Sequence, residues 1–442
     1  MTATDLKAWA SPGAWTSGAA ARAAGEPAWA AERRRRAAAV AAELPFPDRS
    51  LELWRRSDFG SLQLDALDPL ATSSGVSGCG GLSSRVREHL GAPESGAALL
   101  AQCNNTVVLE QLSPALAARG VIVCSTDRAV REHSGLLEPR LHTLFEPGLD
   151  RYAALQQAMR CGGAFVHVPD GVAIEEPIRL FQGIDHAGVA THPASVTVLG
   201  RGARATVIEE LLSDTAEGTS FHGGSTEVFV GEDAKLIHAS LQDWGRNVYH
   251  YSNQRADVGR GAELQWIQTL LGGRMEKTNS YFSMVEPGAK VYVHGFMFGD
   301  GRQHFDMHTL QRHLKDHTTS DLLIKSCLKD RARSVYQGLI QVSEGAQRTD
   351  AYQANRNLLL SGTARADSIP GLEILANDVR CTHGATIGTV DADQMYYLMS
   401  RGLPSQDAQR LIVEGFFVPV LDRIPLESVR EQLRGVIQAK IG

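Results

Sequence analysis

A short turn that ends in alanine recurs along the chain, and this repeat constrains the fold more than any other feature. Turns reading Gly-Arg-Gly-Ala, Gly-Glu-Asp-Ala, Gly-Arg-Gly-Ala and Glu-Pro-Gly-Ala begin at positions 200, 231, 259 and 286, so that their spacing is nearly even. Runs rich in Val, Ile, Thr and aromatic residues lie between them, without a helical pattern. The repeat predicts stacked coils of strands, because Gly permits each bend and Ala permits close stacking.

The same ending continues toward the C-terminus with less regular spacing. Further turns begin at positions 329, 343 and 361. The turn at 329 lies far from the one at 286, whereas the turns at 343 and 361 follow at short intervals. We expect coils with variable insertions from this spacing. An antiparallel β-sandwich is the alternative, since it also alternates strands and turns. The repeat favours a β-helix core, which we place at residues 161–390.

Residues 1–160 read as an N-terminal region of mixed helical and αβ character. Good helix formers fill 28–44, strand-like runs cover 106–111 and 121–125, and a helix is predicted over 150–159. Gly and Ser dominate residues 73–84, which predicts a flexible connection. The basic run Arg33–Arg36 is interpreted as a solvated helix face.

Residues 391–442 are predicted to form a C-terminal helical region. Asp391 can cap a first helix, with Gln394 three residues later as in a capping box. Ser405 begins a second helix, and Pro425 stands in the first turn of a third. These helices carry more apolar residues than their packing against one another would bury. We therefore expect the helices to pack on the β-helix or to dock a partner.

Composition and charge exclude several classes of function. A net charge of −6 gives no support to nucleic-acid binding. No stretch approaches the roughly 18 apolar residues of a membrane span, and the N-terminus does not resemble a secretory signal. The six cysteines are scattered without a Cys-x-x-Cys pair, which is typical of reduced cytosolic thiols. We expect a cytoplasmic protein that contacts neither nucleic acid nor membrane.

Two short patterns could hold a metal. Cys381 and His383 share a strand face, because side chains alternate along a strand, and they offer one thiolate and one imidazole. A buried Cys beside a hydrogen-bonded His is the structural alternative, and two ligands do not complete an iron site. His304, Asp306 and His308 have the same spacing and resemble the ligand set of non-haem iron oxygenases. A solvated polar strand face is the alternative there.

Other patterns give weaker signals. Gly78-Cys79-Gly80-Gly81 lacks the lysine of a phosphate-binding loop, and no Walker A motif is present, so the sequence indicates no ATPase. Cys103 and Cys124 lie in apolar, strand-like settings and are interpreted as structural.

The segment from Gln353 to Gly402 resembles the C-terminal core of the SufB/SufD family of SUF iron–sulfur cluster assembly scaffolds. The similarity is carried by Gln-Ala-Asn-Arg-Asn-Leu-Leu-Leu-Ser (353–361), by Ile-Pro-Gly-Leu-Glu-Ile-Leu-Ala-Asn-Asp-Val-Arg-Cys-Thr-His-Gly-Ala-Thr-Ile-Gly (369–388) and by Asp-Ala-Asp-Gln-Met-Tyr-Tyr-Leu (391–398). It extends over roughly residues 85–440. The resemblance implies a right-handed parallel β-helix between an N-terminal and a C-terminal helical part.

The residues around Cys381 and His383 resemble those of the SufD branch of that family. The resemblance implies that the chain is no enzyme, pairs with SufB through the β-helix and docks the SufC ATPase on residues 391–442. In this way it would support cluster assembly and iron acquisition. It also implies a transient iron–sulfur cluster at the interface with SufB and no tightly bound cofactor on the isolated chain. His383 carries over as the family's ligand or proton-relay group, with Cys381 second. The cluster-nucleating cysteine of SufB aligns with Asn355, which cannot act as a thiolate.

Three alternatives remain at this level. A SufB-like homodimeric scaffold is one, and a homodimer is also expected of the chain when it is alone. A β-helix enzyme such as a polysaccharide lyase or an acyltransferase is another, although no acid cluster is evident and aromatic residues make up only 6%. An iron oxygenase built on His304, Asp306 and His308 is the third.

Overall fold

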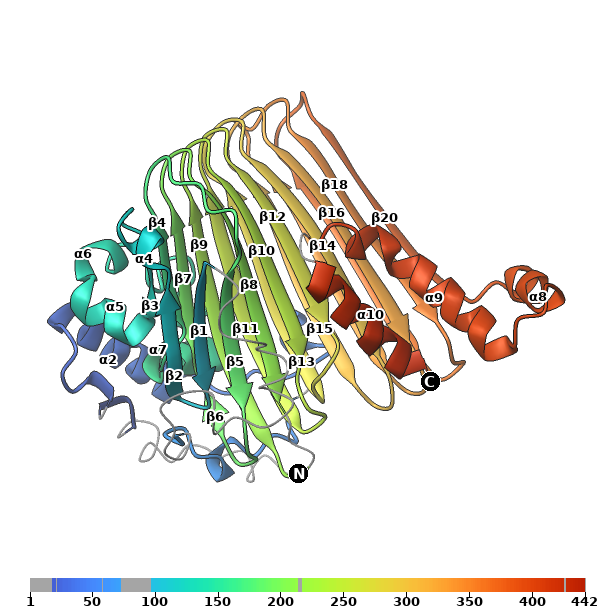
Figure 1. Ribbon diagram of the computed structural model, residues 1–442, viewed down its shortest axis with the longest axis horizontal. Coiled ribbons are helices and arrows are strands. Elements are labelled where there is room, and N and C mark those ends of the chain that lie inside the picture. Colours follow the sequence, from blue (N-terminus) through green and yellow to red (C-terminus); the bar gives the residue numbers. More distant parts are fainter. Residues whose placement is uncertain are drawn as a thin grey trace.

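The chain forms a solenoid of two facing β-sheets with helices at both ends, seen in Figure 1. The computed structural model describes residues 18–20, 22–57, 59–72, 97–213, 217–424 and 427–441. One sheet has the order β2-β1-β5-β8-β10-β12-β14-β16-β18-β20, and the other has the order β19-β17-β15-β13-β11-β9-β7-β4-β3, with β6 beside β9. The first sheet comprises β1 (Ala98–Cys103), β2 (Thr106–Leu112), β5 (Ile178–Ile184), β8 (Arg204–Ser213), β10 (Lys235–Asp243), β12 (Glu263–Leu270), β14 (Lys290–Gly299), β16 (Thr319–Leu328), β18 (Asp350–Leu359) and β20 (Arg380–Thr389). The second comprises β3 (Ile122–Ser125), β4 (Ala164–Val168), β6 (Ala190–Thr191), β7 (Ala194–Leu199), β9 (Ser220–Val230), β11 (Val248–Val258), β13 (Met275–Met284), β15 (His304–His313), β17 (Arg333–Val342) and β19 (Arg365–Ile374).

From β7 to β20 the chain alternates between the two sheets, and these strands pair in parallel within each sheet. Only β1–β2 and β3–β4 are antiparallel among the strand pairs that the structure describes. The predicted mainly β fold with a parallel β-helix core is therefore confirmed.

The coils differ in length by only a few residues, so the expected variable insertions are small. Lys290, Thr319, Asp350 and Arg380 begin successive strands of one sheet and pair in direct register, without a shift between coils. The turns at 329 and 361 precede strands of the other sheet, whereas the turn at 343 precedes β18. The uneven spacing in the sequence arises because similar turns occur at both edges of the solenoid.

The repeated turns work as the sequence predicted. The third residue of each regular turn has positive φ: 66° at Gly202, 56° at Asp233, 61° at Gly261 and 75° at Gly288. Only Gly, and to a lesser extent Asp or Asn, adopts this left-handed conformation at low cost. The alanine that follows each of them is completely buried. A larger side chain there would collide with the adjacent coil.

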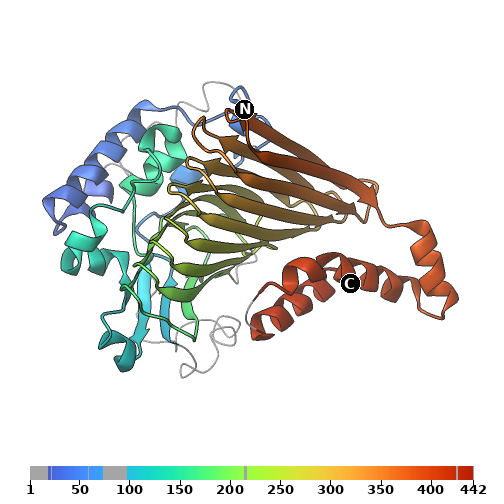
Figure 2. The same cartoon turned by 90° about the horizontal axis from the view of Figure 1, so that it is seen from above.

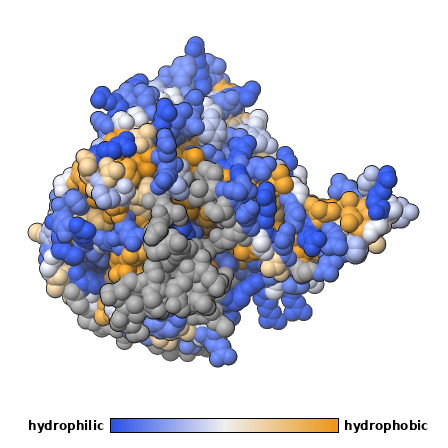
Figure 3. Space-filling view, viewed as in Figure 1, coloured by the Kyte–Doolittle hydropathy of each residue, from blue (hydrophilic) through white to orange (hydrophobic). Residues whose placement is uncertain are grey.

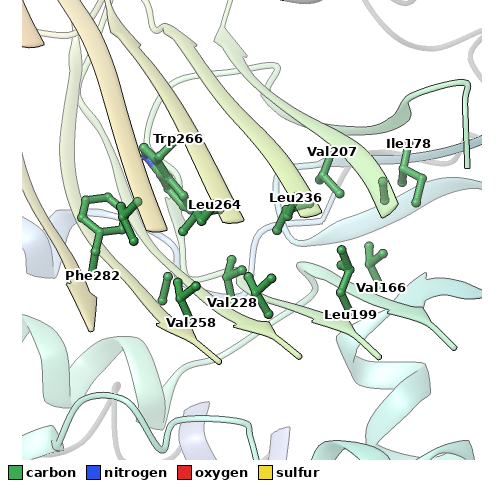
Figure 4. Close-up of a cluster of buried hydrophobic side chains, with 14 of the residues drawn as sticks. Val166, Ile178, Leu199, Val207, Val228, Leu236, Val258, Leu264, Trp266 and Phe282 are labelled. Atoms are coloured by element: carbon green, nitrogen blue, oxygen red, sulfur yellow. The ribbon is translucent and has the colours of Figure 1, made fainter. Parts of the chain in front are cut away.

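The interior between the sheets holds the main hydrophobic core, shown in Figure 4. Val207, Leu236 and Leu264 project from one sheet toward Val228 and Val258 of the other. All are essentially excluded from solvent. Burying each such side chain contributes roughly 1.5–3 kcal/mol, so stacking the coils supplies most of the favourable energy of folding.

The N-terminal region covers the first coils. It contains α2 (Ala28–Glu43), η2 (Glu52–Trp54), η3 (Leu64–Ala66), α4 (Pro114–Ala117), α5 (Thr126–Glu132), α6 (Ser134–Leu137), η5 (Pro147–Leu149) and α7 (Arg151–Ala158). The predicted helices and strands of this region are confirmed, with small differences at their ends. The predicted flexible connection, 73–84, lies outside the described residues.

The basic run on α2 is only partly a solvated face. Arg34 is 3% exposed, donates hydrogen bonds to the carbonyls of Ala158 (2.8 Å) and Arg160 (3.0 Å), and pairs with Glu26 at 2.6 Å. It therefore ties α2 to the end of α7, because a buried guanidinium is stable only when its donors are satisfied. The interpretation of all four arginines as solvated is corrected at this position.

Three C-terminal helices follow the last strand: α8 (Ala392–Ser400), α9 (Ser405–Leu421) and α10 (Glu427–Ile441). The Asp391 side chain caps α8, as predicted, by accepting from the backbone N–H groups of Asp393 (2.8 Å) and Gln394 (3.1 Å). The expected start of the third helix at Pro425 lies outside the described residues. Figures 1 and 2 show α9 and α10 lying along one sheet while α8 projects away from the solenoid.

Within the described ranges, none of the helices combines the length and the apolar character that a bilayer crossing requires.

Candidate functional site

The last coil leaves the solenoid open at one end. β19 and β20 stand at the ends of their sheets, and in the described part of the chain no further strand pairs with their outer edges. Residues that would be buried in a middle coil are therefore exposed here, including Leu372 (37%), Ile374 (38%) and Ile387 (49%). The end of the solenoid thus combines free backbone hydrogen-bonding groups with apolar side chains.

Cys381 and His383 lie on the inner face of this last coil. Cys381 packs beside Ile340 and Val342 of the interior, and His383 follows two positions later on the same face of β20. Cys381 is half-buried, whereas His383 is exposed, because no further coil covers it. The two predicted site residues are therefore brought to one face at the open end.

The chemistry of this pair depends on the thiol. Burial, with a smaller contribution from the negative charge of Asp350, raises the pKa of Cys381. The group is thus a thiol at neutral pH until a metal displaces its proton. In the described structure no hydrogen bond fixes the His383 ring, so its nitrogens stay accessible to an incoming ligand or proton.

The inner face beneath His383 is rigid. Gln353 lies in register with His383 on β18 and is fully buried. Its amide donates to the carbonyls of Gly371 (3.0 Å) and Gly338 (3.3 Å), and its side-chain oxygen accepts from the Tyr336 hydroxyl at 3.2 Å. This network supports the strand that carries His383 but offers no further metal ligand.

Asn355 makes structural hydrogen bonds inside the solenoid. It is buried on β18, donates to the carbonyl of Ile324 at 3.3 Å and accepts from the Asn357 amide at 2.7 Å. Across the described residues, no group of three or more His, Cys, Asp or Glu side chains is placed to hold a metal ion. Any metal at Cys381 and His383 therefore needs ligands from another molecule.

His304, Asp306 and His308 do not form an open iron site: Asp306 and His308 are buried, and His304 is partly exposed. They lie on the outer face of β15, where the carboxylate of Asp306 is 2.9 Å from the Lys277 ammonium and 2.9 Å from Nε2 of His308. Ser57 also donates a hydrogen bond to this carboxylate. Both carboxylate oxygens of Asp306 therefore already lie against groups of the protein.

This buried ion pair has a structural role in holding the N-terminal segment. Lys277 donates to the carbonyl of Leu53 at 2.6 Å, and its ammonium lies 4.8 Å from the centre of the Trp54 ring. Burial alone would raise the pKa of the Asp306 carboxyl, but Lys277 and His308 outweigh burial and lower the pKa to about 2. Sequence reasoning missed Lys277, which lies one coil before Asp306, in register with it.

A second buried polar cluster, inside the solenoid, was also missed. Nδ1 of His250 lies 2.7 Å from the Glu276 carboxylate, and Nε2 of His222 lies 3.0 Å from the Gln182 side-chain oxygen. The two imidazole rings meet edge to face with centroids 4.7 Å apart. Nearby, burial raises the pKa of Glu209 to about 7. Since these residues come from different strands, only the register brings them together.

The C-terminal helices build the other notable surface. Phe417 of α9 packs on Phe296 and Phe298 of β14, with ring centroids 4.8 and 6.1 Å apart. Lys325 donates to the carbonyl of Phe416 at 2.6 Å, and Arg423 lies 2.7 Å from Nε2 of His294. Burial, reinforced by Arg423, lowers the pKa of His294 to about 3, so this histidine stays neutral. α9 and α10 are therefore fixed to the sheet.

α8 differs from its neighbours because none of its residues is buried. Tyr396 is 76% exposed, Tyr397 56% and Met399 47%. Figure 3 shows apolar surface on this projecting arm. Contiguous exposed aromatic and apolar residues on a helix are typical of a protein-binding surface.

The other cysteines that the structure describes, Cys103, Cys124, Cys161 and Cys327, are all buried. Cys103 and Cys124 are buried, as predicted, and burial raises the pKa of Cys124 to about 12. Cys79 and its glycine-rich surroundings lie outside the described residues.

The fold is thus a parallel β-solenoid with an open final coil and a projecting helical arm. Residues 182–416 match the model described as the SUF system FeS cluster assembly SufBD core domain, and residues 92–180 match the SufBD protein N-terminal region. The chain belongs to the SufBD family, whose members assemble iron–sulfur clusters within the SUF system.

Individual relatives agree with this assignment. The chain is 29% identical over 424 residues to the iron–sulfur cluster assembly protein SufD of Bacillus subtilis, and the aligned region covers 94% of this chain and 95% of that protein. It is 26% identical over 354 residues to an iron–sulfur cluster assembly SufBD family protein of Staphylococcus saprophyticus, with 79% and 76% of the two chains covered.

Proposed function

We propose that this chain is the SufD-type subunit of a SUF complex, which pairs with SufB through the open end of its solenoid and binds the SufC ATPase through its C-terminal arm. The observation that carries the proposal is the juxtaposition of Cys381 and His383 on a coil that lacks a covering neighbour in the described part of the chain. The similarity to SufD over nearly the whole chain supports the choice of branch.

Pairing at the open end is supported by its backbone and side chains. A free strand edge is a template for pairing with another strand, and β19 and β20 present two such edges side by side. Leu372, Ile374 and Ile387 would lose their contact with water when a partner stacks on this end. The same geometry would serve a second copy of the chain in the absence of SufB.

Cluster assembly at this interface follows from the incomplete ligand set. Cys381 and His383 provide one sulfur and one nitrogen donor, whereas an iron in a cluster takes four ligands. The remaining donors would come from SufB and from the inorganic sulfide that is being assembled. Such a shared site releases its cluster when the interface opens, which suits a transient cargo.

Docking of SufC is proposed on α8 and the exposed flank of α9. α8 is the part of the arm that makes no buried contact with its own chain, whereas α9 and α10 are packed on β14 and β16. A pull on α8 would therefore be transmitted through α9 to the sheet. ATP-driven approach of two SufC subunits would in this way strain the solenoids and expose the interface that contains His383.

The site is tested by co-expressing the chain with its host's SufB and SufC, as wild type and as His383→Ala. Thr382→Ala, on the opposite face of β20, is the matched control. After anaerobic purification we expect equal complex formation in all three. We expect iron and acid-labile sulfide to fall only in His383→Ala. Unchanged loading in that variant would reduce the chain's role to holding its partners together.

The docking surface is tested separately with Tyr397→Asp. Because Tyr397 is exposed and packs against no core residue, the substitution should leave the fold intact. We expect the variant to keep SufB, and to lose SufC on affinity purification when the two are co-expressed without SufB. Normal SufC binding by this variant and by a chain that lacks residues 391–442 would show that docking occurs elsewhere.

A further inference from the structure

A small polar pocket lies in the N-terminal region, far from the open end. It has a volume of about 240 Å³ and lies between α2 and the loop before α7. Arg33 and Arg36 of α2 face His142, Glu146 and Gln157 across it. The volume is below the roughly 300–1,000 Å³ of pockets for drug-sized molecules, so the pocket suits a small ligand.

The two arginines present donors on one face of α2, because residues three positions apart are neighbours on a helix. Arg33 uses Nη1 to donate to the carbonyl of Leu141 at 2.7 Å, and its guanidinium is steadied by the Trp29 ring at 5.1 Å. Arg36 pairs with Glu146 at 3.0 Å, but both side chains are largely exposed (67% and 74%). A surface pair of this kind contributes little and is easily exchanged for a stronger partner.

His142 lines one side of the pocket, and its backbone is held in place by the surrounding chain. Its φ is 55°, a conformation that a non-glycine residue adopts only when its surroundings hold it there. The buried carboxylate of Glu227 provides that restraint by accepting hydrogen bonds from the backbone N–H groups of His142, Thr143 (2.9 Å) and Leu144 (2.8 Å). These hydrogen bonds fix the backbone that carries the His142 ring at the pocket wall.

The His142 ring lacks a partner where one is expected. Its Nε2 atom is buried and makes no hydrogen bond within the described part of the chain. Buried polar atoms in folded proteins nearly always have a partner, from the protein, from water or from a ligand. Burial and the nearby guanidinium groups of Arg160, Arg34 and Arg33 lower the pKa of His142 well below its usual range. The neutral imidazole can thus offer one N–H to an acceptor.

The charges around the pocket favour an anion. Two guanidinium groups face a single carboxylate, Glu146, which is already paired with Arg36, and the neutral His142 ring adds a hydrogen-bond donor. Arginine presents its donors as a planar fork that matches the oxygens of a phosphate group. We propose that this pocket binds the phosphate group of a small phosphorylated metabolite or free phosphate, held by Arg33, Arg36 and His142.

The test uses the full chain and titration calorimetry with two probes, inorganic phosphate and phosphoserine. The double variant Arg33→Gln/Arg36→Gln removes both guanidinium groups. Arg35→Gln is the matched control, since Arg35 is exposed on the same helix and pairs with Glu32 away from the pocket. His142→Asn removes the ring while Asn tolerates the left-handed backbone.

We expect saturable binding by wild type and by Arg35→Gln. We expect an affinity at least about tenfold lower for the double variant and for His142→Asn, with circular dichroism unchanged. Tighter binding of phosphoserine than of inorganic phosphate would identify an organic phosphate as the ligand, and equal binding would identify phosphate itself. The proposal is overturned if neither probe binds saturably, or if the double variant binds as tightly as Arg35→Gln.

Discussion

Replacing Lys277 by Met tests the reinterpretation of His304, Asp306 and His308 as a structural anchor. The Lys277 ammonium is buried, 2.9 Å from the Asp306 carboxylate and 2.6 Å from the carbonyl of Leu53. Met keeps much of the side-chain volume but leaves the carboxylate without its cation. Breaking a buried ion pair on one side costs about 3–5 kcal/mol, a large part of the roughly 5–15 kcal/mol that stabilises a typical domain.

A double-mutant cycle gives the sharper measurement. The free energy of unfolding is measured in urea for Lys277→Met, Asp306→Leu and the double variant. Because two apolar residues of similar volume can replace a buried ion pair at little cost, the double variant should be more stable than Lys277→Met. A cost below about 1 kcal/mol for Lys277→Met, or simple additivity in the cycle, would refute the anchor.

The pH dependence of stability provides an independent check on the same pair. The pKa of Asp306 is lowered in the folded chain to about 2, against a reference value of 3.8. A lowered carboxyl pKa adds stability that is present above the unfolded pKa and is lost as the pH falls toward the folded pKa. The contribution is about 2 kcal/mol and should vanish between about pH 4 and pH 2. Limited proteolysis should release the segment around Leu53 over the same range.

Further predictions concern the helices and the interior. Phe417→Ala should lower the free energy of unfolding by about 3–5 kcal/mol, because it opens a cavity against Phe296, and it should expose α9 to protease before the solenoid is cut. Ala262→Leu should cost about 1–3 kcal/mol or more by overpacking two stacked coils, and urea unfolding measures it. Burial raises the pKa of Glu209 to about 7, so its contribution to stability is complete below about pH 4.5 and is lost as the pH rises to 7. The free energy of unfolding of the wild type should therefore fall by about 3 kcal/mol across that range through this group, and Glu209→Gln should lack this fall. Urea unfolding of both proteins at several pH values measures the difference.

The coil architecture could be predicted from the sequence because its signals are local. Each turn needs a residue that tolerates positive φ, followed by a residue small enough to stack, and both can be recognised within four consecutive residues of the sequence. The length of each coil was harder to obtain. Turns at opposite edges of the solenoid use similar residues, so the uneven spacing of the turns at 329, 343 and 361 indicated larger insertions than the structure has.

The surroundings of the candidate sites could not be predicted, because they depend on register. The alternation of side chains correctly placed Cys381 and His383 on one face. That this face lies at the end of the solenoid depends on β20 being the last strand of its sheet. Likewise, nothing near Asp306 in the sequence points to Lys277 or to Ser57, which lies 249 residues away.

The central claim is that the open end of the solenoid is the surface that joins SufB. It is tested most directly by Ile387→Asp, which places a charge on the exposed inner face of the last coil, where Ile387 is 49% exposed. Leu51→Asp, at an equally exposed leucine (50%) in the N-terminal region, is the control. Each variant is co-expressed with SufB and SufC and purified through a tag on this chain.

The account predicts that Ile387→Asp retains SufC and loses SufB, whereas Leu51→Asp retains both. Recovery of SufB with Ile387→Asp at the level of the control would contradict it and would place the interface on another surface.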